Sequence, residues 1–120
     1  MAKFLDMQVI FDGCGQRAVL DRELPFAVKA VFSLSGVKGR YVAHRRRKAR
    51  LVFVALAGRC RVAVGEAGSA EVFTLTAGTR ALLLEPADRR ELYDFSEDCL
   101  LFVLASVPED AADLLPDFPA

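Results

Sequence analysis

The single histidine of the chain lies inside a strongly basic segment. His44 follows Arg40 and is itself followed by four arginines and a lysine, at positions Arg45, Arg46, Arg47, Lys48 and Arg50. Imidazole titrates near neutrality, and neighbouring positive charge lowers its pKa, so a neutral His44 could accept a proton at pH 7. This residue type in this setting suits general acid and base catalysis. The alternative is that His44 is a surface residue without a chemical role.

The basic segment has three interpretations. Guanidinium groups match phosphate oxygens in geometry, so the segment could bind the diphosphate of a nucleotide. It could equally be a solvated strand edge whose charges oppose aggregation. Nucleic acid is not expected as a partner, because the chain has a net charge of zero and the run from 44 to 50 contains no aromatic residue.

A second polar stretch follows Pro86 and contains Arg90 and Tyr93. Arg90 could enter the same pocket as His44, with Tyr93 near its rim as a second proton carrier. The alternative is a loop between two strands whose charges pair at the surface. Nothing within the stretch decides between these interpretations.

The cysteines give no sign of a metal site or of a disulfide scaffold. Cys14, Cys60 and Cys99 are widely spaced and form no C-x-x-C pair, which is typical of a reducing compartment. Cys60 and Cys99 lie in apolar segments and are predicted to be core residues, whereas Cys14 is predicted to be exposed. With one histidine and no thiolate cluster, we expect no bound metal and no other cofactor.

Length and composition indicate one globular domain over residues 1–120, of which 53% are hydrophobic and 27% charged. No apolar run reaches the ~18 residues of a membrane span, and Asp6 lies where a signal peptide would be apolar. We therefore expect a cytoplasmic protein with no membrane partner.

Residues 1–60 hold 12 Lys and Arg against 4 Asp and Glu, a net charge of +8, and residues 61–120 hold the reverse.

Short apolar segments bounded by Gly, Pro or charged residues recur along the chain and predict an all-β fold. The predicted strands are residues 8–11, 17–20, 28–34, 51–56, 60–64, 72–75, 81–84, 91–95 and 99–104. Residues 51–56 and 100–104 are apolar on both faces, so each should be covered by a second sheet or by a partner subunit. The second possibility points to a dimer.

Two further local predictions concern the candidate pocket and the C-terminus. On a strand, positions 42, 44 and 46 share one face, so Val42, His44 and Arg46 would look into one pocket if that face lines a barrel. Ser106, with Glu109 three residues later, forms a capping box and predicts one short helix over residues 106–115.

The order of these segments resembles the sugar 3,4-ketoisomerase (WxcM-like) family. Residues 93–106 (YDFSEDCLLFVLAS) are similar to that family's D-F-S-x-D-C followed by an apolar run and V-L-A-S. Further matches are residues 12–15 (DGCG), 25–32 (PFAVKAVF) and 56–62 (LAGRCRV). The resemblance implies a cupin-type antiparallel jelly roll and a homodimer.

The resemblance also shows where this chain departs from the family pattern. Counted back from Gly58 without gaps, the family's H-A-H falls on residues 44–46, so His44 matches the first histidine and Arg46 replaces the second. If the alignment is shifted by two residues, the family's two histidines fall instead on Val42 and His44. The family's Arg of D-x-R-G is Cys14 here. Its K-R-V-Y reads Lys-Ala-Val-Phe at 29–32, and the W-H after the late proline reads Arg-Arg at 89–90.

What the resemblance implies is tautomerisation of a dTDP-linked 4-keto-6-deoxyhexose through an enediol, in deoxysugar or surface-polysaccharide biosynthesis. His44 would be the acid and base, and Tyr93 a second proton carrier. Arg46, Arg90 and Lys29 would bind or polarise the substrate, since arginine, with a pKa above ~12, cannot replace an imidazole in proton transfer. The alternative is a catalytically degenerate cupin that binds a nucleotide sugar, another anion or a partner enzyme without turnover.

Overall fold

The computed structural model of the chain describes residues 2–19, 24–43, 48–66, 68–78, 80–86 and 88–108. Within these residues the chain forms eleven strands. They are β1 (Lys3–Asp6), β2 (Gln8–Asp12), β3 (Gly15–Val19), β4 (Ala30–Ser35), β5 (Tyr41–Ala43), β6 (Leu51–Ala57), β7 (Arg59–Val64), β8 (Glu71–Thr76), β9 (Arg80–Leu84), β10 (Arg90–Tyr93) and β11 (Leu100–Ala105). No described segment is a helix with the length and apolar character needed to cross a membrane.

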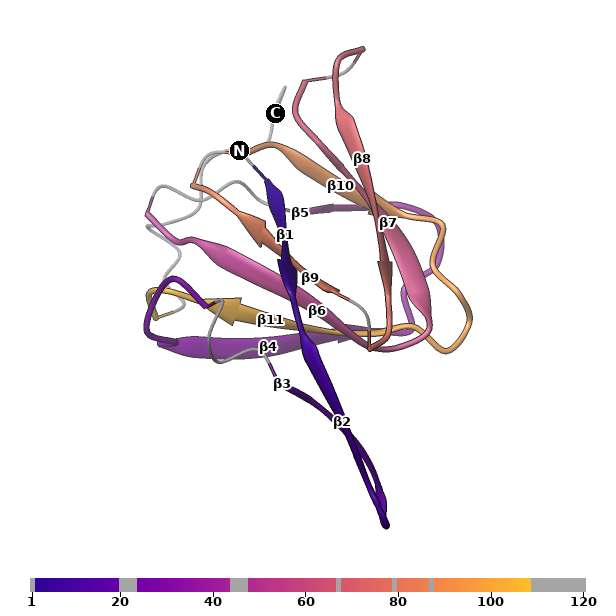
Figure 1. Ribbon diagram of the computed structural model, residues 1–120. Coiled ribbons are helices and arrows are strands. Elements are labelled where there is room, and N and C mark those ends of the chain that lie inside the picture. The colour runs from indigo at the N-terminus through magenta and orange to yellow at the C-terminus, as the bar shows by residue number, and fades with distance from the viewer. Residues whose placement is uncertain are drawn as a thin grey trace.

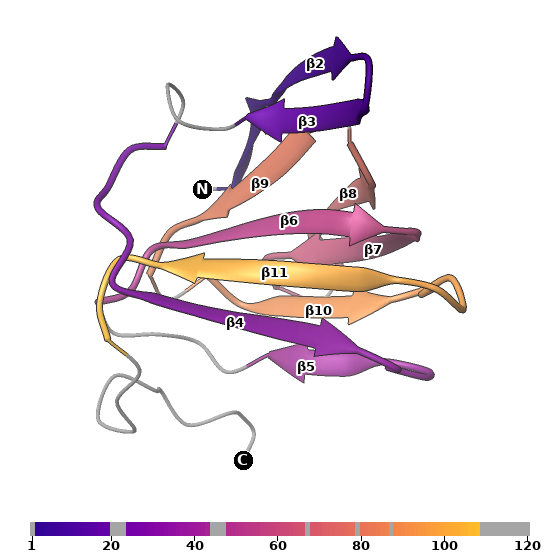
Figure 2. The ribbon, with the colours of Figure 1, turned by 90° about the horizontal axis from the view of Figure 1, so that it is seen from below.

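Two antiparallel sheets face one another (Figures 1 and 2). The larger has the strand order β1-β9-β6-β11-β4, and the smaller has the order β5-β10-β7-β8. Strands β2 and β3 pair only with each other among the described strands, and Figure 1 shows their hairpin projecting away from both sheets. The antiparallel jelly roll predicted from the resemblance is confirmed.

The core between the sheets follows from alternation along the strands. In β7, Cys60, Val62 and Val64 are buried while Arg59 and Arg61 are exposed, because successive side chains of a strand point to opposite faces. The buried side chains of β7, β8 and β10 pack against Phe53, Leu101 and their neighbours in the larger sheet. This inner core holds the two sheets together.

The outer face of the larger sheet is covered only in part. Val52 and Leu83 are buried there, and the partly buried residues Leu24 and Phe26 pack over them. Leu56, by contrast, remains 48% exposed. Residues 51–56 and 100–104 were predicted to be covered on both faces. The second sheet covers their inner face, and the described chain covers their outer face only in part.

All nine predicted strands are present, with ends that differ by one or two residues. Two strands were not predicted, β1 and β5, both of which are short. Strand β10 ends at Tyr93 and does not reach Phe95, because Asp94 adopts a left-handed backbone conformation with φ of 57°.

The predicted C-terminal helix is not tested by the described residues. Ser106 and Val107 form a bend, and the part of the segment from Glu109 onward lies outside the residues that the structure describes.

Gly58, between β6 and β7, has no room for a side chain. Its φ is +68°, and a Cβ at this position would overlap Ser96 Oγ and lie 2.9 Å from Cys99 Cα. We expect Gly58→Ala to lower the free energy of unfolding by about 2 kcal/mol or more and the melting temperature by about 10 °C. Gly39→Ala is the matched control, since Gly39 has φ of +76° but open space around it. Equal melting temperatures of the two variants in circular dichroism would contradict this prediction.

Candidate functional site

The strand pairings bring the candidate residues Arg90 and Lys29 to one end of the roll, here called the Arg90 end. Leu51, the first residue of β6, pairs with Ala105 at the end of β11. The turn at Gly58 sends the chain back as β7, so the end of β7 lies at the same end of the roll as the start of β6. There Val64 pairs with Arg90, the first residue of β10. Figure 2 shows the start of β4 at this end as well, directly after Lys29.

Arg90 is the one buried charged residue in the described part of the chain, and it has no exposed surface. It lies two residues before the buried Leu92, so both side chains point to the inner face of the smaller sheet. Removing a guanidinium from water costs several kcal/mol, roughly, unless charged or polar groups compensate. A buried cation at the end of an apolar core is a candidate for binding an anionic group.

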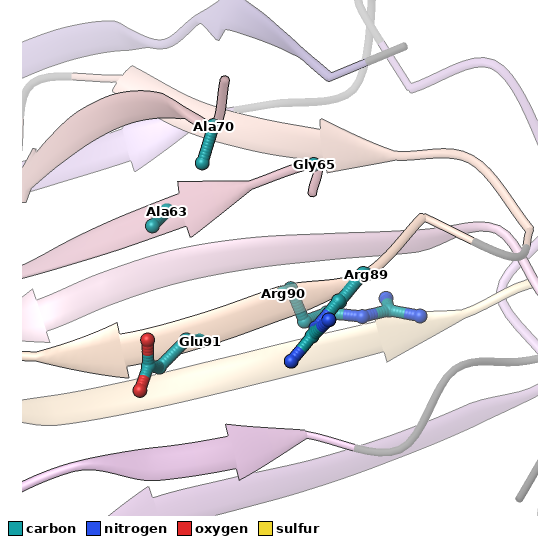
Figure 3. Close-up of a pocket in the computed structure, with 6 residues that line it drawn as sticks. All are labelled: Ala63, Gly65, Ala70, Arg89, Arg90 and Glu91. Atoms are coloured by element: carbon teal, nitrogen blue, oxygen red, sulfur yellow. The ribbon is translucent and has the colours of Figure 1, made fainter. Parts of the chain in front are cut away.

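A small pocket opens beside Arg90 (Figure 3). Its volume is about 70 Å³, and the residues that line it are Ala63, Gly65, Ala70, Arg89, Arg90 and Glu91. A water molecule needs roughly 10–15 Å³, whereas sites for drug-sized ligands span about 300–1,000 Å³. The pocket has room for several waters or one phosphate-sized group, but not for a whole nucleotide sugar.

Cations and acids are interleaved at the Arg90 end. Arg50 forms an ion pair with Glu85 at 3.0 Å, and Arg89 Nη1 lies 3.4 Å from Glu66 Oε2. Lys29 is exposed at the start of β4, and its backbone N–H donates to the carbonyl oxygen of Ala105 at 2.8 Å. The positive side chains at this end therefore include exposed, half-buried and fully buried groups.

His44 and Arg46 lie outside the described residues. What the structure gives is the strand that leads to them. Ala43, the residue directly before His44, pairs with Arg90 across β5 and β10, and Val42 pairs with Glu91. Roles for His44 and Arg46 stay predictions.

Tyr93 does not join Arg90. It is half-buried and alternates with Leu92, so it lies on the outer face of the smaller sheet, where its strand neighbour is Arg61. The guanidinium carbon of Arg40 lies 4.8 Å from the centroid of the Tyr93 ring. Strand alternation thus directs the side chains of Tyr93 and Arg90 to opposite faces of the smaller sheet. The roles of Tyr93 near the pocket and in proton transfer stay predictions.

The cysteines are placed as predicted. Cys14 is exposed, Cys60 and Cys99 are buried, and none of the three, all of which the structure describes, forms a disulfide. Burial raises the pKa of Cys60 to about 12, and the nearby Cys99 thiol adds to this effect. Burial also raises the pKa of Cys99. Neither buried thiol is suited to nucleophilic catalysis.

Metal ligands do not gather anywhere in the described part of the chain. No group of three or more His, Cys, Asp or Glu residues there could hold a metal ion. His44 is not among these residues.

Comparison with known proteins now places the chain. The family model described as "FdtA: WxcM-like, C-terminal" matches residues 1–119. The chain belongs to this WxcM-like family. A curated relative, the TDP-4-oxo-6-deoxy-alpha-D-glucose-3,4-oxoisomerase of Aneurinibacillus thermoaerophilus, is 30% identical over 97% of this chain and 86% of its own length.

Solved structures agree with the WxcM-like assignment. WlaRB, a TDP-quinovose 3,4-ketoisomerase from Campylobacter jejuni, is 25% identical with a TM-score of 0.85, covering 98% of this chain and 93% of its own. A variant of the 3,4-ketoisomerase QdtA from Thermoanaerobacterium thermosaccharolyticum, in complex with TDP-4-keto-6-deoxyglucose, is 23% identical with a TM-score of 0.88, covering 98% and 88%. At that identity the second match supports the fold alone.

The sequence did not reveal the partners of Arg50 and Arg89. Neither Glu85 nor Glu66 is marked by any motif, and the pairs become visible only when the strand order brings segments 35 and 23 residues apart together.

The buried thiols generate a prediction about alkaline stability. Because folding raises the pKa of Cys60, the folded state keeps a proton that the unfolded chain releases. This contribution to stability is complete below about pH 9 and is lost as the pH rises toward 12. We expect the urea midpoint to fall more steeply above pH 9 for the wild type than for Cys60→Ala. Thiol titration at pH 8 is the control: Cys14 alone should react in the native protein, and a rapid reaction of all three cysteines would contradict the prediction.

Proposed function

We propose that this protein is a sugar-nucleotide 3,4-ketoisomerase that acts on a dTDP-linked 4-keto-6-deoxyhexose in deoxysugar or surface-polysaccharide biosynthesis. The observation that carries the proposal is the match over nearly the whole chain to a relative named as a TDP-4-oxo-6-deoxyglucose 3,4-oxoisomerase. The buried cation Arg90, opposite the strand residue that precedes His44, is consistent with an anionic substrate at this end of the roll.

The reaction moves a carbonyl group from C4 to C3 of the sugar. A base removes the proton on C3, the C3–C4 bond becomes the double bond of an enediol, and an acid returns a proton to C4. The hydroxyl proton passes from the oxygen on C3 to the oxygen on C4, so no oxidant or reductant is consumed. Such a step needs a proton-transfer group of near-neutral pKa beside the sugar.

His44 is the proposed proton-transfer group. It is the only imidazole of the chain, and it follows Ala43, which pairs with Arg90. Consecutive Cα atoms are about 3.8 Å apart, so the backbone of His44 is one residue from this pair. That separation is compatible with action on a substrate whose anionic groups contact Arg90.

Arg46, Arg90 and Lys29 are the proposed substrate-binding residues. A buried guanidinium can stabilise the negative oxygen of an enediolate, which is the task we assign to Arg90. Lys29 is exposed at the same end and forms no ion pair with another described residue, which suits it to bind a diphosphate in solvent. Arg46 would contribute a second guanidinium from the basic segment.

Hydrogen exchange at the sugar tests the assignment of His44. We expect the wild type, incubated in D2O with dTDP-4-keto-6-deoxyglucose, to introduce deuterium at the reacting carbons and to form the 3-keto isomer. His44→Ala should reduce the rate by about 100-fold or more, because an acid and base of this kind contributes 10²–10⁴-fold, roughly. Proton NMR of the sugar ring gives both rates.

The same experiment separates the alternatives. Tyr93→Phe should retain most of the activity, because Tyr93 lies on the outer face of the sheet, away from Arg90. A large loss in Tyr93→Phe would instead support it as the second proton carrier. Binding of dTDP by calorimetry without any exchange in the wild type would favour the degenerate cupin and overturn the enzyme assignment.

We also propose that the protein is a homodimer. Apolar side chains remain exposed on the outer face of the larger sheet, where Val31 is 54%, Leu56 48% and Phe102 37% exposed. The β2–β3 hairpin projects into solvent with Phe11 76% exposed, and an isolated two-stranded hairpin is only marginally stable in water. A second copy would cover both features.

Disrupting the outer face of the larger sheet tests this proposal. We expect the wild type to sediment at about 26 kDa, twice the mass of 13.1 kDa, and Phe102→Asp to shift it toward the monomer. Val72→Asp is the matched control, because Val72 is 51% exposed but belongs to the smaller sheet. Equal dimer fractions for the two variants in analytical ultracentrifugation would argue against an interface on this face.

The cytoplasm remains our proposed compartment and metal independence our proposed mode of action. The three cysteines without a disulfide are compatible with a reducing environment. A tautomerisation through an enediol, with His44 as the acid and base and Arg90 stabilising the oxygen, does not require a metal ion.

A further inference from the structure

Arg50 and Glu85 form a two-pronged ion pair at the Arg90 end. Arg50 Nε donates to Glu85 Oε1 at 3.0 Å, and Nη2 donates to Oε2 at 3.2 Å. The side chains are 35% and 33% exposed, so water screens this pair less than an exposed one. Two parallel hydrogen bonds between planar groups fix the orientation of both side chains.

The backbone of Arg50 is held as well. Its N–H donates to Ser106 Oγ at 2.9 Å, and its carbonyl oxygen accepts from the Ser106 N–H at 3.1 Å. Arg50 is the last residue of the basic segment that contains His44, and it directly precedes β6. This end of the basic segment is therefore tied to the end of β11 by its backbone and to Glu85 by its side chain.

Glu85 is also part of the turn that leads to Arg90. The Glu85 N–H donates to Asp88 Oδ2 at 3.1 Å, and the Asp88 N–H donates to the carbonyl oxygen of Glu85 at 3.3 Å. After Asp88 the carbonyl oxygen of Arg89 accepts from the Gly65 N–H at 2.8 Å. Arg90 is the next residue, so these bonds set the point at which it enters the sheet.

We propose that Arg50 and Glu85 are positioning residues for the ketoisomerase reaction. Their ion pair fixes the start of β6 relative to the turn that places Arg90. The inference rests on the proposed function and extends it to residues that do not contact the substrate. Displacements of about 1 Å can cost a reaction up to ~100-fold, so a shift of the turn that places Arg90 affects turnover more than the binding of dTDP.

Glu85→Gln is the first test, since it keeps the size of the side chain and removes its charge. We expect kcat to fall by about five- to tenfold while the Kd for dTDP changes by less than about twofold. Steady-state turnover of dTDP-4-keto-6-deoxyglucose and calorimetric titration with dTDP measure the two quantities. A general loss of folded protein would instead lower the number of dTDP sites.

Glu66→Gln is the matched control. It removes the same charge at the same end of the roll, but its partner Arg89 is held only at 3.4 Å and Glu66 lies in the turn between β7 and β8. We expect its kcat to equal that of the wild type. An equal fall in kcat for Glu66→Gln and Glu85→Gln would overturn the proposal, because the loss would then come from the net charge at the Arg90 end and not from the ion pair with Arg50.

A charge exchange tests the pair itself. The double variant Arg50→Glu with Glu85→Arg should recover at least half of the kcat lost in Glu85→Gln, roughly, if the link between the segments is what counts. An unchanged kcat in Glu85→Gln, or a double variant no better than Arg50→Glu alone, would overturn the proposal.

Amide hydrogen exchange measures the link without any turnover. In Glu85→Gln we expect the N–H groups of Arg50, Glu85 and Ser106 to exchange about tenfold faster, while those of β8 are unchanged. If the wild type does not convert the substrate, the proposed function fails. Faster exchange at these three amides would then still assign the ion pair its part in holding the two segments, and unchanged exchange would reject that part as well.

Discussion

The burial of one apolar face of each sheet against the other is the constraint on which the rest of the structure depends. It sets which residues of each strand point inward, and it leaves the ends of the roll as the places where polar groups can meet a ligand. Arg90 is an exception to this apolar inner face, and the exception points to a functional role. It occupies an inward position of β10, next to Leu92, where an apolar residue would be expected. The fold accepts a cation there at the margin of its core.

The charge asymmetry of the sequence also acquires a structural meaning. Residues 1–60 are basic and residues 61–120 acidic, yet the strand order interleaves the two halves, with β6 between β9 and β11. Arg50 meets Glu85, and Arg40 meets Glu91. Arg59, too, reaches across to Asp94. Opposite charges that are remote in sequence thus become neighbours.

Strands were predictable from the sequence because alternation and turn residues are local signals. The short strand β5 was not predicted, because three residues are too few to show an alternation of polar and apolar residues. Its pairing with β10 also joins segments that are far apart in the sequence. The opposite directions of the Arg90 and Tyr93 side chains were predictable, because positions three apart on a strand face opposite sides. The ion pair of Arg50 with Glu85 was not predictable, because it requires knowing that β6 lies beside β9. The roles predicted for His44 and Arg46 rest on residue chemistry, strand alternation and family resemblance, and both residues lie outside the described part of the chain.

The order of strands in the larger sheet has a consequence for how the chain acquires its structure. Strands β7 and β8 are joined by a short turn and can pair early, at a small cost in loop closure. β11, in contrast, inserts between β6 and β4, the latter some 70 residues earlier in the chain, roughly. Until β11 has left the ribosome, β4 and β6 have no common neighbour, and their unpaired edges are open to other chains. The larger sheet is thus completed only by β11, the last of the described strands to be synthesised, and the nascent protein is most prone to aggregation before β11 emerges.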